Sequence, residues 1–226
     1  MSQRTVGGGV TSSPSSANPP LSAAATQMKA AGDRAFERAE KTSAEFFAIT
    51  YGALVRQMLV DHNENPDTVN SQLDLMGERI GVRLIEDFAA KSGVPACRTI
   101  AQAAECAARV GLKMYLGISA NVDILPPSTV QGVGNSNANT DSSTTVVITF
   151  DENPLNLFVE LPEVLQNTLW YSNVLCGVLR GALGQVGFLC QVTFTKDVLR
   201  GSETNEIRVR FVGREKETFK VADLQK

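Results

Sequence analysis

Residue types that could carry chemistry are scarce in this chain. It has one histidine, His62, and its four cysteines are Cys97, Cys106, Cys176 and Cys190. With a single imidazole, a catalytic triad, a histidine acid–base pair or a histidine–carboxylate metal site can hardly be built. The cysteines form no C-x-x-C pair and no dense framework, which is typical of a reducing compartment. We therefore predict no catalytic residue and no metal site.

Cys97 is the thiol with the most informative surroundings, because it lies just beyond the end of a predicted helix. Asn65 is a candidate N-cap with Pro66 at the first helical position, and Gly93 is the expected stop. Apolar residues recur every three or four positions along this helix, at Val69, Leu73, Met76, Ile80, Leu84 and Phe88. Such a stripe is stable only when it is buried. The other three cysteines lie in apolar stretches and are expected to be inert core thiols.

Five glycines lie within predicted helices. Gly77 and Gly81 are four residues apart beside the apolar stripe, whereas Gly177, Gly181 and Gly184 share one face of a later helix. A glycine costs about 1 kcal/mol relative to alanine in a helix interior. Their use indicates that another backbone or a ligand comes unusually close. For the later three, close helix packing is the simpler interpretation, and room for a bound acyl chain is the alternative.

Two further helices flank the long one. The first starts near Ser43, whose hydroxyl can cap it. The second follows Thr99, which has the spacing of a capping box, and it is small and apolar nearly all round. Its one polar stripe is formed by Glu105, Arg109 and Lys113. We therefore expect a mostly buried helix with a single solvent-facing edge.

Strands are predicted where β-branched and aromatic residues gather or alternate with polar ones. They cover Val122–Leu125, 144–150, 188–199 and 206–213, with a helix over Thr168–Gly187 between the second and the third. The order of three helices, two strands, one helix and two strands indicates an antiparallel sheet with helices on one face. The predicted fold class is therefore α+β, in a single domain.

The amino-acid composition along the sequence divides the chain into three parts. Residues 1–42 are predicted to be a low-complexity, mostly disordered N-terminal extension, in which residues 27–41 either form part of a helix or extend the next one. Residues 43–214 are predicted to be the folded domain, with a mobile loop at 128–143. Residues 215–226 are predicted to be a C-terminal tail.

Charge and hydropathy exclude several classes of partner. The net charge of −3 gives no electrostatic case for binding nucleic acid. The N-terminus has no apolar core of a secretory signal. The most apolar window, residues 174–192, is interrupted by Arg180 and Gln185, which favours a buried helix over a membrane span. We expect a cytoplasmic protein that reaches membranes only through a partner or a lipid.

Several motifs taken together resemble one family. They are TYGALV (50–55), GVRLIEDF (81–88), KMYLGI (113–118), NPLNLFVELP (153–162), YSNVLCGVLRGAL (171–183) and EIRVRF (206–211). Over about residues 43–213 the chain closely resembles the Bet-three type of subunit of TRAPP, the transport protein particle. The resemblance implies a helical layer on a four-stranded antiparallel sheet. It also implies a non-catalytic core subunit that dimerises through its helices, with itself or with a related small subunit.

The resemblance also implies a role in membrane traffic. Such a subunit would act in vesicle tethering in ER-to-Golgi and Golgi traffic, together with other TRAPP subunits. It would contribute to the scaffold that promotes nucleotide exchange on a Rab GTPase. The expected location is cytoplasmic and peripheral at cis-Golgi and ER–Golgi membranes, so that Golgi and vesicle membranes are reached indirectly.

The family carries a buried hydrophobic channel, and the resemblance assigns two residues to it. Cys97 matches the cysteine that can hold a palmitoyl group inside the channel, and Gly111 matches the small residue at the channel mouth. No cofactor other than this palmitoyl group is expected. One departure concerns the family's basic residue directly before the cysteine, which is Ala96 here, with Arg98 after the cysteine instead. A nearby cation lowers the pKa of a thiol and raises its reactivity, so this departure bears on self-acylation.

Two other classes of function compete with the scaffold subunit. A carrier of acyl chains or other lipids would use the channel itself as its binding site and would exchange its chain reversibly with free fatty acid. A thiol acyltransferase would use Cys97, but it would need a histidine near the thiol, and His62 is the only one in the chain. The sequence therefore favours the non-catalytic subunit.

Overall fold

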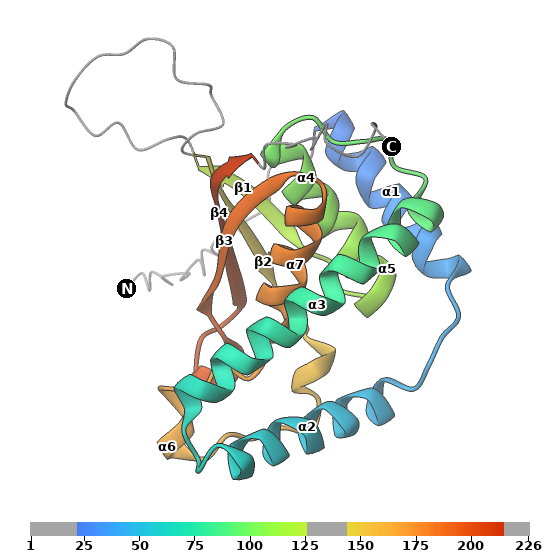
Figure 1. The fold of residues 1–226 in the computed structure, drawn as a ribbon. Helices are drawn as coiled ribbons and strands as arrows, with labels where there is room; N and C mark the ends of the chain where they lie inside the picture. Colours follow the sequence, from blue (N-terminus) through green and yellow to red (C-terminus); the bar gives the residue numbers. More distant parts are fainter. Residues whose placement is uncertain (1–21, 126–143, 215–226) are drawn as a thin grey trace, which may run out of the picture.

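The computed structural model describes residues 22–125 and 144–214 (Figure 1). The α-helices are α1 Ala23–Arg38, α2 Ala44–Asp61, α3 Pro66–Ser92, α4 Ile100–Cys106, α5 Leu112–Leu116, α6 Glu163–Gln166 and α7 Val174–Gln185. The π-helix η1 spans Ala107–Gly111, and the short 3₁₀ helices are η2 Pro154–Asn156 and η3 Val198–Arg200. The strands are β1 Asn121–Leu125, β2 Thr145–Phe150, β3 Phe188–Lys196 and β4 Asn205–Arg214.

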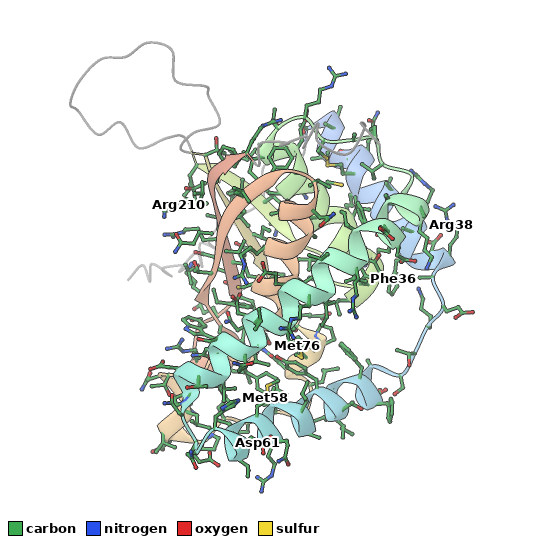
Figure 2. All side chains as sticks on the ribbon, in the orientation of Figure 1. Phe36, Arg38, Met58, Asp61, Met76 and Arg210 are labelled. Atoms are coloured by element: carbon green, nitrogen blue, oxygen red, sulfur yellow. The ribbon has the colours of Figure 1, made fainter. Side chains whose placement is uncertain are left out.

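The four strands form one antiparallel sheet in the order β1-β2-β4-β3. Alternation along the strands places one set of side chains inward: Val146 and Ile148 of β2 lie opposite Val209 and Ile207 of β4, and all four are buried. Arg210, on the other face, points away from the helices (Figure 2). Helix α7 covers the inner face, and α3 crosses over α7 (Figure 1). The predicted α+β fold, a helical layer on a four-stranded antiparallel sheet, is confirmed.

Local capping chemistry sets the ends of α3. The side chain of Asn65 accepts hydrogen bonds from the backbone N–H groups of Asp67 and Thr68, at 3.1 and 3.2 Å. Pro66 occupies the first turn, and Gly93 ends the helix in the left-handed conformation with φ 67°. The predicted bounds of this helix are confirmed. The same chemistry starts α2, where the Ser43 hydroxyl accepts from the Phe46 N–H.

Helices α3 and α7 touch backbone to backbone. A Cβ atom added to Gly77, Gly81, Gly177 or Gly181 would overlap a backbone oxygen of the opposite helix. These four residues are called the glycine seam below. They confirm that the predicted close approach is made by another backbone. Gly184 does not belong to the seam, because a Cβ there would meet nothing within 4 Å.

An ion pair reinforces the seam from α7. The guanidinium of Arg180 bonds the carboxylates of Asp74 and Glu78, which lie one turn apart on α3, and the contact to Glu78 is 2.9 Å. All three side chains remain partly exposed, so solvent screens the pair and its contribution to stability is modest. The close approach of the backbones therefore depends mainly on the glycines.

Helix α1 lies where the sequence indicated mostly disorder. Within the predicted extension 1–42, Ala23–Arg38 forms a helix whose N-terminus is capped by the Ser22 hydroxyl. Gly32 sits directly against the carbonyl oxygen of Arg109, and the ring of Phe36 packs over Gly117. This packing against η1 and α5 compensates for the weak apolar stripe of α1. Residues 1–21 lie outside the described residues.

The predicted solvent-facing edge at Glu105, Arg109 and Lys113 is wrong, because α1 covers it. The side chain of Arg109 is only 7% exposed, and its Nε donates to Glu105 at 3.0 Å. The Lys113 ammonium lies 5.2 Å from the centre of the Phe36 ring and 4.0 Å from the Asp33 carboxylate of α1. A polar stripe on a helix can therefore face a second amphipathic helix as well as water.

The last helix starts later than the sequence indicates. Helix α7 begins at Val174, six residues after the expected start at Thr168. Asn70 of α3 explains the difference, because its side chain donates to the Thr168 carbonyl and accepts from the Trp170 N–H, both at 2.8 Å. The first bond takes the Thr168 carbonyl, which a helix starting there would need for the N–H four residues on, and together the two bonds hold this segment against α3. The expected loop at 128–143 lies outside the described residues.

Candidate functional site

A cavity of about 510 Å³ lies between α3, α7 and the helices that follow Cys97. Its volume lies within the roughly 300–1,000 Å³ of small-molecule pockets. The described residues that line it include no charged side chain. The walls are formed from α3 by Ile80, Leu84, Ile85, Phe88 and Ala89 and from α7 by Val174, Leu175, Val178, Leu179, Ala182 and Leu183, with Val186 just after its end. Such a space accepts an apolar chain and repels ions and polar ligands.

The cavity runs alongside the glycine seam and extends beyond it. On α7 its lining begins at Val174, before Gly177, and on α3 it begins at Ile80, next to Gly81, and continues past the seam to Ala89. The predicted apolar stripe of α3 is therefore divided. Its first residues, Val69 and Leu73, are fully buried in the core, whereas its later ones form a cavity wall.

Cys97 lies in the wall of this cavity. It belongs to the segment between α3 and α4, is half-buried, and shares the cavity with Gly111. Ala96 also lines the cavity, whereas Arg98 does not. The structure thus brings together the two residues that the sequence singled out, Cys97 and Gly111, although they are 14 positions apart in the chain.

Cys106 belongs to the site, although nothing in the sequence indicated it. It was expected to be an inert core thiol, but it lines the same cavity as Cys97. Its hydrogen bond to Cys97 lowers the pKa of Cys97 to about 7, although partial burial opposes this effect. The same bond and burial raise the pKa of Cys106. Cys97 is therefore the thiol of the pair that loses its proton more easily, and it is also the less buried residue. The nine-residue spacing is no known motif, so only the fold reveals this pair.

Gly111 ends the π-helix η1, which widens the turn on this side of the cavity. A Cβ at Gly111 would lie 3.9 Å from the ring of Phe88, which is an ordinary contact. A methyl group therefore fits there, whereas a longer side chain would extend into the cavity.

The remaining thiols behave as the sequence predicts. Burial raises the pKa of Cys176 and raises that of Cys190 to about 12. Over residues 22–125 and 144–214, the acidic, cysteine and histidine side chains form no cluster of three that could hold a metal ion. In the same ranges, none of the helices combines the length and apolar character needed to cross a membrane.

The fold is a helical layer on an antiparallel sheet, and its candidate site is an apolar cavity with a thiol in the wall, which suits the binding of an apolar chain. In comparison with known proteins, residues 47–210 match the family model described as transport protein particle (TRAPP) component. The chain therefore belongs to the TRAPP component family, and within it to the Bet3 type. It is a non-catalytic structural subunit of a vesicle-trafficking complex, as the resemblance predicted.

Individual relatives show how close the similarity is. The transport protein particle subunit bet3 of Schizosaccharomyces pombe is 43% identical over 178 residues, which cover 79% of this chain and 88% of the relative. The trafficking protein particle complex subunit BET3 of Saccharomyces cerevisiae is 38% identical over 184 residues, covering 81% and 88%. A crystal structure of trafficking protein particle complex subunit 3 from Naegleria fowleri, covalently bound to palmitic acid, is 43% identical with a TM-score of 0.67. That similarity covers 77% of this chain and 98% of the other.

Proposed function

We propose that this chain is a core subunit of the TRAPP complex that acts in vesicle tethering in ER-to-Golgi and Golgi traffic. In this role it contributes to the scaffold that promotes nucleotide exchange on a Rab GTPase. It works in the cytoplasm, peripherally at cis-Golgi and ER–Golgi membranes. The match over residues 47–210 supports this proposal. The test is GDP release from the Rab by the particle assembled with and without this chain. Faster release only with the chain is expected, and equal release contradicts the exchange role.

The partner in the complex is a second small subunit, identical or related, bound through the helices. Helix α2 supports this proposal, because it exposes Phe46 by 70%, Ile49 by 63% and Val60 by 54%. These residues recur at helical spacing, and an apolar stripe of this kind marks an interaction surface. Phe46→Asp should therefore weaken dimerisation with itself or with a related subunit, as measured by analytical ultracentrifugation. Unchanged association would contradict this use of α2.

Cys97 carries a palmitoyl group whose chain fills the cavity, with Gly111 at the cavity mouth. The observation that carries this proposal is the placement of the Cys97 thiol in the wall of an uncharged, 510 Å³ cavity. A palmitoyl group covalently bound in the Naegleria fowleri relative supports it. Each buried CH₂ contributes about 0.8 kcal/mol, so a long chain can contribute on the order of 10 kcal/mol. The acyl chain can gain this free energy in the cavity or in a bilayer, but not in both at once. An acyl chain inside the cavity therefore stabilises the fold and does not anchor the protein to a membrane.

Intact mass spectrometry before and after hydroxylamine tests the attachment. Hydroxylamine cleaves thioesters, so the protein isolated from its native cells should lose one palmitoyl mass. Peptide mapping should place the group on Cys97, and Cys97→Ser should carry no such group. No loss of mass, or a group mapped to another residue, would contradict the attachment.

An acyl-chain carrier is the second candidate, favoured by the apolar lining of the cavity. It predicts that Cys97→Ser still binds free fatty acid reversibly, as measured by exchange of a fluorescent fatty acid. Stable thioester formation without such exchange would exclude the carrier.

The domain organisation belongs to the same proposal. Residues 43–214 form the subunit domain, 1–42 an extension that contains α1, and 215–226 a tail. Limited proteolysis tests these boundaries, which should appear as the first sites of cleavage. An early cut within α3 or α7 would contradict them.

A further inference from the structure

A cleft of about 720 Å³ lies between α1 and the segment that joins α3 to α4. Most of the described residues that line it are apolar, among them Met28 and Ala31 of α1 and Val94 and Pro95 of the joining segment. None of these four residues is fully buried. An open groove with apolar walls of this kind is typical of a docking surface.

Two arginines line the same cleft, one on each side. Arg34 belongs to α1, Arg98 follows the joining segment, and both residues are exposed. Within residues 22–125 and 144–214, none of the ion pairs involves either guanidinium. No acidic residue is among the described ones that line the cleft. An occupant that carries carboxylates together with an apolar group would therefore complement it.

The described part of the chain ends beside this cleft. Arg214, the last residue of β4, donates from its guanidinium to the carbonyl oxygen of Arg98. Residues 215–226, called the C-terminal segment below, follow directly and lie outside the described residues. Twelve extended residues reach about 40 Å. The C-terminal segment is therefore long enough to enter the cleft beside which it begins.

The sequence of the C-terminal segment matches the lining of the cleft. It begins EKETFK, in which Glu215, Glu217 and Phe219 alternate with two lysines and a threonine. Alternate side chains of an extended chain share one face, so the two carboxylates and the ring would point the same way. We infer that the C-terminal segment docks in the cleft between α1 and the joining segment. Glu215 then meets Arg98, Glu217 meets Arg34 across the cleft, and the ring rests on the apolar walls.

Docking of this kind joins three parts of the molecule. Helix α1 packs mainly on η1 and α5, and the C-terminal segment would link it to the joining segment and to the end of β4. The two ion pairs lie at an exposed rim, where solvent weakens them, so the ring of Phe219 supplies the desolvated contact. Because the C-terminal segment is covalently attached to β4, its effective concentration at the cleft is high, and weak contacts suffice.

Cleavage after Lys220 by the protease Lys-C, followed by intact mass, tests the docking in the full chain. This protease cleaves after lysine only, so substitutions to or from arginine leave its sites unchanged. When docking and release are fast, the rate of cleavage follows the fraction of molecules in which the segment is released. The unaltered chain should be cleaved at least about ten-fold more slowly in buffer than in urea, which releases the segment.

Two single variants should abolish this protection. Arg34→Glu and Glu217→Arg should each speed cleavage in buffer about ten-fold, because each replaces a charge-assisted contact with repulsion. The rate of each variant is divided by its own rate in urea, which removes differences in how well the protease accepts the sequence. The combined variant, with both substitutions, exchanges the two charges and should slow cleavage again.

Arg38→Glu is the matched control, because Arg38 lies on the same helix (Figure 2) and is not among the residues that line the cleft. It should leave the rate unchanged, and circular dichroism verifies that all variants fold. Cleavage of the unaltered chain as fast in buffer as in urea would overturn the docking, as would equal acceleration by Arg34→Glu and Arg38→Glu. A combined variant no slower than the single ones would overturn the pairing of Glu217 with Arg34. Protection that disappears on dilution would show that a second copy supplies the segment, which would overturn docking within one chain.

Discussion

Helix α3 meets α7 in two contrasting ways. Along the glycine seam, the two backbones are in direct contact with no side chain between them. Beside and beyond this seam, Leu84 of α3 and Ala182 of α7 line a cavity of about 510 Å³. One pair of helices therefore contributes both a direct contact between backbones and two walls of an apolar cavity.

The contrast shows how a cavity can persist in a close-packed protein. Apolar walls tend to collapse, because an empty space forfeits dispersion contacts. Here the seam fixes the distance between the two helices, and η1 contributes a widened turn to another wall of the cavity. The space is thus held open by the backbone, and an acyl chain would supply the missing contacts.

Breaking the seam should have the largest effect. Gly177→Leu places a side chain against the backbone of α3 at Asp74, so the helices must separate. We expect a loss of about 4 kcal/mol or more in the free energy of unfolding, measured by urea denaturation. Gly184→Ala is the matched control on the same helix, because open space surrounds that position. It should be neutral or stabilising by up to about 1 kcal/mol. Similar losses for both variants would contradict the seam.

Filling the cavity should separate its role from that of the seam. Gly111→Leu should leave the fold intact but lower the rate of acylation at Cys97 about five- to 150-fold, because its side chain competes with the acyl chain for space and overpacking costs about 1–3 kcal/mol. Gly111→Ala should acylate normally, since its methyl group meets Phe88 at an ordinary distance. The measurement is intact mass after incubation with palmitoyl-coenzyme A, with circular dichroism to verify folding. Normal acylation of the leucine variant would show that the acyl chain does not lie beside residue 111 in the cavity.

Removing the second thiol should have a smaller effect that depends on pH. In Cys106→Val the pKa of Cys97 should rise from about 7 toward the ordinary value of about 8.5. Acylation needs the thiolate, so the midpoint of its rate against pH should lie about one pH unit higher than in the unaltered chain. At pH 7 it should be several-fold slower, with little difference at pH 9. The rate of alkylation by iodoacetamide across this range measures the same midpoint. An unchanged midpoint would show that Cys106 does not tune Cys97.

Most of the structural features that could be predicted from the sequence depend on interactions between residues close together in the chain. Asn65 and Gly93 act on their own chain neighbours, and alternation in β4 reports a half-buried strand, so these elements were predictable. The start of α7 was not predictable, because it depends on Asn70, about 100 residues away in the chain. The side chain of Asn70 bonds the Thr168 carbonyl and the Trp170 N–H. The position of α1 depends on contacts with η1, which a thin apolar stripe does not disclose.

The candidate site also has parts that could be predicted from the sequence and parts that could not. Cys97 and Gly111 were reached through a resemblance to a family, and the fold places both in one cavity wall. The cavity was expected only through the resemblance, because an apolar stripe such as Ile80, Leu84 and Phe88 looks the same in the sequence whether it faces a packed core or an open space. The contact of Cys106 with Cys97 was hidden too, because it depends on how the segment before α4 folds back.

Thermal unfolding with and without thioester cleavage tests the central claim most directly, that the acyl chain lies in the cavity and stabilises the fold. The acylated protein should melt at a clearly lower temperature after hydroxylamine, whereas Cys97→Ser should melt at that lower temperature with or without treatment. Membrane recruitment of Cys97→Ser within the assembled complex should remain intact. Identical melting of the acylated protein before and after cleavage would contradict the account.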